Sequence, residues 1–254
     1  MKFDDLDKKM REFETAHDRC IPTESYIIAR IDGRSFTQLT KEKCDFERPF
    51  DVRFRDMMIE TTKHLMNSGF KVIYGYTESD EISLLFDPGI CAFGRKTRKY
   101  VSILAGEASA KFSLLLGALA AFDCRIIEIP DKRVVVDYFR WRNEDAHRNA
   151  MNAHCYWMLR KENLPKNEAI LFIEKKTLVE KKELLLSRGI NFDEIADWQK
   201  YGIGLYWGVE EKKGFNPKDQ IEVVTKRNVI KVDLDLPKSD KYGDLVMRLL
   251  SPGT

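Results

Sequence analysis

The sequence predicts an α+β protein built around a small sheet, on three observations. Four apolar runs of strand length are bounded by polar or turn-forming residues: 25–31, 71–76, 82–86 and 125–129. Two longer segments between them, around residues 50–65 and 96–119, have the character of helices. Of 254 residues, 43% are hydrophobic, which is enough to bury a substantial core. The order strand, helix, strand, strand, helix, strand is that of the ferredoxin-like, split βαβ arrangement.

The first elements follow from local pattern. Residues 3–19 are charged and helical in character with few apolar anchors, whereas residues 25–31 form an apolar run typical of a buried strand. The next helix carries apolar or small side chains on one face: Phe50, Phe54, Met57, Met58, Thr61 and Leu65. Pro49 precedes this helix and Gly69 follows it, and both residue types are suitable helix boundaries.

A hairpin and a second helix complete the expected sheet. Strands at residues 71–76 and 82–86 flank a short polar turn, and the sequence DPG at residues 87–89 ends the hairpin. Small side chains would let the helix at residues 96–119 pack closely on a sheet: Ala105, Gly106, Ala108, Ser109 and Ala110. Pro130 then ends the fourth strand.

The second half of the chain predicts helices followed by short strands. Three valines at 134–136 favour a strand, but residues 131–163 have polar and aromatic side chains at helical spacing and no helix breaker before Pro165. We therefore predict a helix there. Residues 165–188 also look largely helical, with Gly189 as their stop. Three short strands follow at residues 204–209, 221–225 and 229–234.

Charge and cysteine content argue against several classes of protein. Charged residues make up 33% of the chain but the formal net charge is only +2, so an RNA-binding surface would have to come from local patches. The five cysteines include no CxxC pair, which argues against a zinc ribbon or a disulfide framework. The first residues lack an apolar signal region, and the longest apolar stretch, residues 114–122, is too short to span a bilayer. We expect a soluble, cytoplasmic protein with no membrane partner.

Two acidic clusters predict a metal site. Asp32 ends the first strand, where Gly33 lets the backbone approach a ligand closely. Asp80 and Glu81 lie in the turn between the second and third strands. In a split βαβ fold these two places are neighbours, so Asp32 and Asp80 would converge and could hold two Mg²⁺ ions around a triphosphate. Each cluster alone is an ordinary turn sequence, and only their conjunction points to phosphoryl or nucleotidyl transfer on a polymerase-type palm.

Other polar segments admit two interpretations. Residues 34–37 would offer backbone N–H groups to phosphates. The sequence RKTRK at residues 95–99 opens a predicted helix, where cations oppose the macrodipole unless an anion such as a triphosphate is present; a solvated basic face is the commoner alternative. His147 and His154 are seven residues apart, which is poor spacing for metal ligands and fits RNA contacts or core positions better. Three aromatic residues are expected in the core: Trp141, Tyr156 and Trp157.

The domain organisation follows from these assignments. Residues 1–130 form a palm-like catalytic core with an N-terminal helix. Residues 131–254 supply a helical segment and a small β-rich C-terminal part. Both are expected to pack together in one compact domain.

The chain resembles the tRNA-His guanylyltransferase family and its Thg1-like proteins over roughly residues 5–160. The sequence RIDGRSF at residues 30–36 matches the family's R-x-D-G-R-x-F, and YGYTESDE at 74–81 contains its S-D-E after a strand beginning with Tyr. The sequence FGRKTRKY at 93–100 is similar to the basic segment F-x-R-R-x-S-K-F, and FDCR at 122–125 looks like F-D-G-R. The motifs occur in the family's order and at its spacings, so the joint match is specific.

The resemblance implies a palm that adds nucleotides to tRNA in the 3′-to-5′ direction. ATP or GTP first activates the tRNA 5′-phosphate, and the 3′-hydroxyl of an incoming nucleoside triphosphate then attacks that end. The site residues that the resemblance implies are metal ligands Asp32, Asp80 and the Gly33 carbonyl; catalytic Asp32, Asp80 and Glu81; nucleotide contacts Asp32, Gly33, Arg34, Ser35, Phe36, Thr37, Ser79, Asp80, Lys96 and Lys99; and RNA contacts Arg125, His147, Arg148 and Asn149. The family enzymes are commonly homotetramers.

One departure from the family pattern bears on the substrate. Members that serve tRNA-His carry H-I-N-N-L-Y-N in the long helix, whereas residues 147–153 here are HRNAMNA. Ala150 and Ala153 replace two asparagines. This points to the Thg1-like branch, which completes 5′-truncated tRNAs by templated addition, rather than to G(−1) addition on tRNA-His.

Alternatives to this function remain open at the level of sequence. The first alternative is a tRNA-His guanylyltransferase. A nucleotide cyclase would share the palm and the metal geometry, and would make product from a nucleoside triphosphate without RNA. A non-catalytic RNA-binding protein is a further class, although three acidic residues without a metal would repel one another.

Overall fold

The computed structural model describes residues 2–40, 44–216 and 221–251. Its elements in chain order are α1 (Phe3–Thr15), β1 (Tyr26–Gly33), α2 (Phe36–Gln38), α3 (Val52–Met66), β2 (Val72–Glu78), β3 (Glu81–Phe86), the 3₁₀ turn η2 (Ala92–Arg95), α4 (Thr97–Leu116), β4 (Phe122–Ile129), α5 (Lys132–Lys161), α6 (Lys166–Glu174), α7 (Leu178–Leu186), the 3₁₀ turn η3 (Phe192–Glu194), α8 (Asp197–Tyr201), β5 (Ile203–Asn216), β6 (Ile221–Asp233) and α9 (Asp240–Leu250).

The strands form one six-stranded sheet in the order β4-β1-β3-β2-β5-β6, and every neighbouring pair is antiparallel. The mixed helix-and-sheet composition that the sequence predicted is therefore confirmed. The C-terminal strands extend the same sheet at the edge of β2. Register places Asp32 of β1 opposite Glu81 of β3 on one side and opposite Asp123 of β4 on the other.

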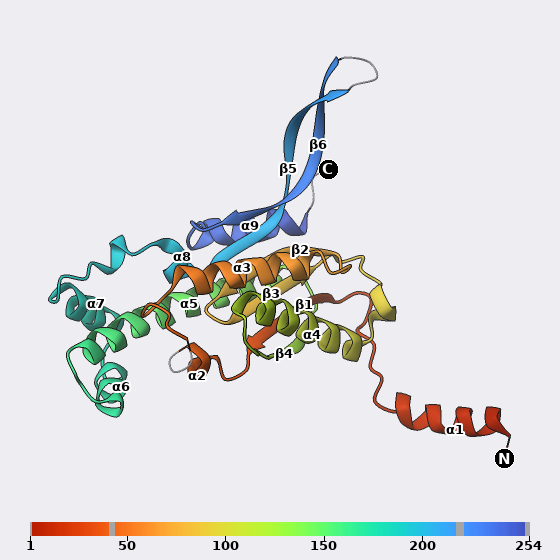
Figure 1. Ribbon diagram of the computed structural model, residues 1–254, viewed down its shortest axis with the longest axis horizontal. Helices are drawn as coiled ribbons and strands as arrows, with labels where there is room; N and C mark the ends of the chain where they lie inside the picture. The colour runs from red at the N-terminus through yellow and green to blue at the C-terminus, as the bar shows by residue number, and fades with distance from the viewer. Residues whose placement is uncertain (1, 41–43, 217–220, 252–254) are drawn as a thin grey trace.

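Helices cover both faces of this sheet (Figure 1). Ile27, Ala29 and Ile31 of β1 pack with α3 and α4, while Ile28 packs with α5 and α9 on the opposite face. Side chains alternate along a strand, so Asp32 belongs with Ile28 on the α5 face. This alternation decides that α5, and not α3 or α4, supplies the partners of the acidic residues.

The C-terminal half of α5 builds a separate cluster of buried side chains with α6, α7 and η3. The buried members of this cluster are Ala150, Met151, Cys155, Met158, Leu159, Ala169, Ile173, Leu185 and Phe192. The long helix thus joins the sheet to the helical segment. The predicted helix at 131–163 is confirmed, and the alternative of a strand at 134–136 is not.

Several element boundaries differ from the sequence predictions. The predicted helix at 165–188 is two helices, because Thr177 caps α7 in a reciprocal capping box with Glu180. The predicted strands at 221–225 and 229–234 are one strand, β6, which pairs with β5 throughout. Helix α9 was not predicted, although its Tyr242 and Val246 are buried against α5 and the sheet.

Two elements extend from the body of the molecule (Figure 1). One is α1, which has no buried residue. The other is the far part of the β5–β6 ribbon, whose strands pair only with each other beyond Tyr206. In the described part of the chain, no helix has the length and apolar character needed to cross a membrane.

Candidate active site

The end of β1 meets the β2–β3 turn through the backbone. The Gly33 N–H donates to the Asp80 carbonyl at 3.0 Å, which holds the turn against the strand end. A Cβ on Gly33 would lie 2.5 Å from the ring of Phe36 and 2.9 Å from the Cβ of Asp80. Glycine is therefore required for this close approach, and the approach brings Asp32 and Asp80 together as the sequence predicted.

The turn itself consists of Ser79 and Asp80 between the paired residues Glu78 and Glu81. Ser79 has a φ of 47°, in the left-handed region that side chains seldom adopt. Its hydroxyl donates to the Asp80 carboxylate at 3.0 Å. This local hydrogen bond within the turn helps to fix the direction of the Asp80 side chain.

A buried arginine from α5 holds both glutamates that flank the turn. Arg142 is 3% exposed and binds Glu81 with two hydrogen bonds, from Nε at 2.7 Å and from Nη2 at 2.8 Å. It also donates to Glu78 at 2.9 Å and to Asp145 at 3.1 Å. Arg30 of β1 makes a second ion pair with Glu81. Sequence reasoning missed Arg142, because nothing near it in the chain marks it as the partner of a turn 61 residues away.

The two aspartates have much weaker compensation. Asp32 lies 3.8 Å from the Arg30 guanidinium and 3.7 Å from that of Arg125. Among the described residues, no cation forms an ion pair with Asp80. Burial raises the pKa of the Asp80 carboxyl, and the negative charge of Asp32 raises it further. Burial and the charge of Glu81 raise the pKa of Glu78 to about 8.

This donor set fits Mg²⁺. Within the described chain, no three His, Cys, Asp or Glu side chains already form a metal-binding group. Mg²⁺ commonly binds through one or two carboxylates and completes its coordination with water and substrate phosphates. Asp32 and Asp80 form such a pair, and the partly buried Asp80 carboxylate would gain a positive charge close to it.

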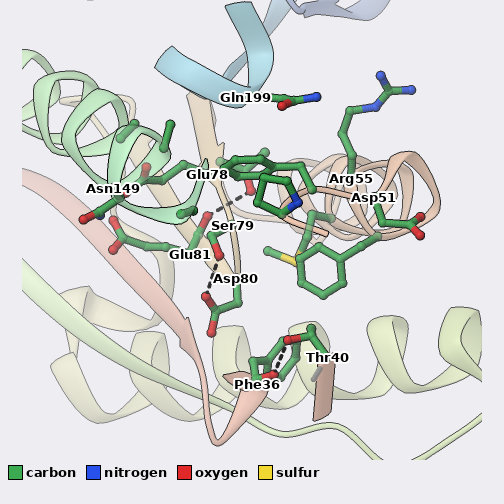
Figure 2. A pocket seen from close by; sticks show the side chains of 18 of the residues that line it. Phe36, Thr40, Asp51, Arg55, Glu78, Ser79, Asp80, Glu81, Asn149 and Gln199 are labelled. Carbon is green, nitrogen blue, oxygen red and sulfur yellow. Dashed lines mark hydrogen bonds between the residues drawn. The ribbon is translucent and has the colours of Figure 1, made fainter. Parts of the chain in front are cut away.

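The aspartates open into a cavity of about 450 Å³. Predicted site residues that line it are Asp32, Phe36, Thr37, Ser79, Asp80, Glu81 and Asn149. In Figure 2, Phe36 and Thr40 lie below Asp80, and Arg55 and Gln199 lie above it. The cavity is in the size range of small-molecule and cofactor sites.

Several lining residues were not predicted from sequence, and they give the cavity an aromatic and basic side: Phe46, Arg48, Phe50, Arg55, Trp157 and Trp198. Two expectations for aromatic residues were incomplete or wrong. Trp157 lines the cavity, and Trp141 is 53% exposed rather than in the core. The Arg142 Cζ lies 4.7 Å from the ring centroid of Trp141. The Trp141 ring therefore covers the ion-pair network on its solvent side.

Other predicted residues lie outside this cavity. The Arg34 N–H donates to the Ala121 carbonyl at 2.8 Å, and Ser35 has a φ of 61°. Lys96 precedes α4 and pairs with Asp18 at 2.8 Å. Phe36 lines the cavity and contacts Phe112 of α4, with ring centroids 5.2 Å apart. Since each helical residue rises about 1.5 Å, Lys96 lies about 24 Å along the helix from Phe112 and the cavity wall. Lys99 lies on the same first turn.

The predicted RNA contacts divide between three places. Asn149 lines the cavity, and Arg125 lies beside Asp32 and Asp123. His147 and Arg148 line a second cavity of about 360 Å³, on another face of α5, with Tyr201 and Lys238. His147 stacks on Tyr201 with 5.2 Å between ring centroids, and burial with the nearby lysine charges lowers its pKa.

Comparisons with known proteins agree with this geometry. The family model for tRNA(His) guanylyltransferase (Thg1) matches residues 7–130, and the Thg1 C-terminal domain model matches residues 133–238. The tRNA(His) guanylyltransferase of Schizosaccharomyces pombe is 31% identical over 224 residues, covering 82% of this chain and 85% of that protein.

Solved structures extend the similarity to the whole fold. A bacterial Thg1-like protein in complex with ATP has a TM-score of 0.76 at 26% identity, covering 96% of this chain and 99% of that one. A complex with GTP gives a TM-score of 0.74. The enzyme from Saccharomyces cerevisiae gives 0.72 at 25% identity, covering 88% and 96%. Fold and site thus define a nucleotidyltransferase. The chain belongs to the tRNA(His) guanylyltransferase (Thg1) family.

Proposed function

We propose that this chain is a Mg²⁺-dependent enzyme that adds nucleotides to the 5′ end of tRNA in the 3′-to-5′ direction. The observation that carries the proposal is the meeting of Asp32 and Asp80 at the wall of a nucleotide-sized cavity. The names of the relatives and the ATP and GTP complexes of similar structures support it. The strand order β4-β1-β3-β2, with α3 and α4 on one face, supports a ferredoxin-like, polymerase-type palm.

Each site residue has a defined role in this proposal. Asp32, Asp80 and the Gly33 carbonyl hold Mg²⁺, which when bound neutralises triphosphate charge and orients the reacting groups. Phe36, Thr37 and Ser79 contact the nucleotide, together with Gly33, Arg34 and Ser35 at the strand end. Glu81 supports the site through its contacts with Arg142 and Arg30. ATP or GTP activates the RNA 5′-phosphate, and the 3′-hydroxyl of the incoming nucleotide then attacks the activated end.

The basic residues outside the cavity are proposed to hold the polyanionic substrates. His147 and Arg148 in the second cavity, with Arg125 and Asn149, would contact RNA. Lys96 and Lys99 lie outside the carboxylate cavity, so they would contact a triphosphate bound elsewhere than at Asp32 and Asp80. The assembly would be a cytoplasmic homotetramer. Lys96→Ala and Lys99→Ala should then raise the KM for triphosphate while RNA affinity stays fixed; the opposite result assigns this segment to RNA. Light scattering of the purified chain tests the tetramer.

For the substrate, we propose templated completion of 5′-truncated tRNA. Ala150 and Ala153 both line the cavity, where asparagines would present amides that donate and accept hydrogen bonds. A site without those groups does not penalise a partner that leaves them unpaired. Base pairing with the opposite acceptor strand, rather than the protein, would therefore select the incoming nucleotide.

The test is a competition between intact tRNA-His and a 5′-shortened tRNA of another identity. All four nucleoside triphosphates are supplied, kcat/KM is compared, and the new 5′ ends are sequenced. We expect the shortened tRNA to be preferred and each added base to follow its template partner. A clear preference for intact tRNA-His would refute the repair function.

The second candidate is G(−1) addition to tRNA-His. It is favoured by the names of the relatives, since the Schizosaccharomyces pombe protein is a tRNA(His) guanylyltransferase. The same competition decides between the two, because G(−1) addition requires rapid non-templated transfer to the intact tRNA.

A further inference from the structure

The side of the cavity away from Phe36 and Thr40 has a composition of its own. We define the Arg–Trp wall as Arg48 with Trp157 and Arg55 with Trp198. In Figure 2, Arg55 and Gln199 lie above Asp80, whereas Phe36 and Thr40 lie below it. The cavity therefore has two distinct sides, and the nucleotide contacts proposed above belong to the Phe36 side.

Two stacked arginine–tryptophan pairs form this wall. The Arg48 Cζ lies 5.1 Å from the ring centroid of Trp157, and the Arg55 Cζ lies 4.9 Å from that of Trp198. Phe50 meets the Trp198 ring edge-to-face, with centroids 6.0 Å apart. Each pair combines a planar cation with an aromatic face. Both kinds of surface stack on nucleobases, and the cation also attracts phosphate.

The character of α5 changes along the face that lines this cavity. Asp145, Asn149, Ala153 and Trp157 all line it at four-residue spacing, so each lies about 6 Å further along the helix. The face is acidic near the turn, polar at Asn149, and then small and aromatic. A phosphate with its metal suits the acidic end, whereas a base suits the aromatic end, where Ala153 leaves room beside Trp157.

The wall presents faces on which a base can stack. Its neighbour on α8 is Gln199, whose side-chain oxygen is already hydrogen-bonded to His154 at 3.1 Å. Stacking is tolerant of sequence because every base has a π face. A wall of this kind holds a base and leaves its identity to pairing with a template.

We propose that the Arg–Trp wall is a second nucleobase site, which stacks a base while another nucleotide lies at the Phe36 side. This rests on the proposed function, because nucleotidyl transfer joins two nucleotides and both sides line the cavity that contains the carboxylates. The base belongs either to the terminal nucleotide of the RNA or to a free nucleoside triphosphate. The chemistry is the same in both cases, and the experiment distinguishes the two sources.

The experiment is a double-mutant cycle measured by binding, without turnover. Wild type and Trp198→Leu are each titrated with a shortened tRNA and with the same tRNA whose 5′-terminal nucleotide is abasic. A parallel arm uses ATP and ribose 5′-triphosphate, which lacks the base. In the wild type we expect loss of the base to weaken binding by about 5-fold to 100-fold in one arm, in line with the worth of a stacked base. In Trp198→Leu this penalty should vanish in that arm.

Controls separate stacking from a general loss of structure. Trp207→Leu makes the same change on β5, outside the cavity, and should keep the full penalty. Arg55→Lys keeps the charge but loses the planar group, and should also reduce the penalty for loss of the base. This variant tests the stacking if Trp198→Leu does not fold. The arm in which the penalty vanishes identifies the source of the base.

An equal penalty in wild type, Trp198→Leu and Arg55→Lys, in both arms, overturns the proposal. Failure of the proposed function would have a different signature. In that case no nucleotide would be added to any RNA, whether or not the base-dependent binding persists.

Discussion

Two pairs of carboxylates lie close together in this molecule, at the β2–β3 turn and the facing end of β1. They differ in the charged groups that surround them. Glu78 and Glu81 share the buried Arg142, and Glu81 also contacts Arg30. Among the described residues, Asp32 and Asp80 share no such partner: Asp32 has only the longer contacts with Arg30 and Arg125, and Asp80 forms no ion pair. Burial raises the pKa of Asp80, and it also raises those of Glu78 and Glu81 in spite of their guanidinium partners. The glutamates thus have close cations within the protein, whereas a bound cation would supply the aspartates with a close positive charge. Adjacent acidic residues of one motif thus stabilise the fold in one case and serve the ligand in the other.

The largest expected effect comes from removing the compensation of the glutamates. Arg142→Met should lower the free energy of unfolding by about 3–5 kcal/mol, because Glu78 would lose its ion-pair partner and Glu81 would keep only Arg30. Chemical denaturation measures this. Lowering the pH should reduce the loss, since protonation removes the stranded charges. Arg140→Met changes a half-exposed arginine on the same helix and should stay within about 0.5 kcal/mol of wild type.

A triple variant sharpens that result. Arg142→Met combined with Glu78→Gln and Glu81→Gln should recover much of the lost stability, because both glutamate charges are removed together with their cation and Arg30 keeps its contact with Asp32. If the triple variant is as unstable as Arg142→Met, packing rather than charge explains the role of Arg142.

Removing either aspartate should leave the fold intact and abolish the reaction. Asp32→Ala and Asp80→Ala should each reduce nucleotide addition by at least about 100-fold, by analogy with the loss of one stabiliser of transition-state charge. Asp80→Ala should melt at the wild-type temperature or above, because its buried carboxylate has no protein cation among the described residues. Asp123→Ala is the matched control, since Asp123 pairs with Asp32 across β4 but does not line the cavity. Retained activity in a folded Asp80→Ala protein would refute the assignment.

The contact between the strand end and the turn can be changed without touching a carboxylate. Gly33→Ala places a methyl group 2.5 Å from Phe36 and 2.9 Å from the Asp80 Cβ, so the turn must shift. We expect addition to slow by about 10-fold to 100-fold, because a displacement near 1 Å has that cost in a preorganised site. Gly106→Ala on α4, where no atom lies within 4 Å, should leave the rate unchanged. Equal rates for both alanine variants would contradict this account.

The smallest effect concerns the hydrogen bond inside the turn. Ser79→Ala removes the hydroxyl that donates to Asp80 at 3.0 Å, and should slow addition by about 2-fold to 10-fold. Ser79→Gly removes the same hydroxyl but relieves the φ of 47°. The glycine variant should therefore match the alanine variant in rate and exceed it in stability. Unequal rates would show that backbone strain, and not the hydroxyl, matters for the reaction.

The local elements and the acidic motifs could be predicted from the sequence. Apolar runs of strand length identified the strands of the sheet that carry Asp32 and the turn, and a long unbroken helical pattern identified α5. These features depend on neighbours in the chain, which periodicity and turn chemistry report directly. The same logic failed for β6 and α9. The far part of the β5–β6 ribbon pairs only with itself, and the amphipathic face of α9 has meaning only against α5 and the sheet.

Which charges meet depends on the packing of segments that are far apart in the chain. Arg142 and the turn that it holds are 61 residues apart, and Arg48, Arg55, Trp157 and Trp198 come from separate segments that converge on one cavity. The same packing pairs Lys96 with Asp18. It also places His147 and Asn149 on two different faces of α5, where they line separate cavities. Burial and long-range contact set the pKa of a carboxyl and the partner of a guanidinium. Neither the burial of a group nor its long-range contacts can be predicted from the residues next to it in the chain.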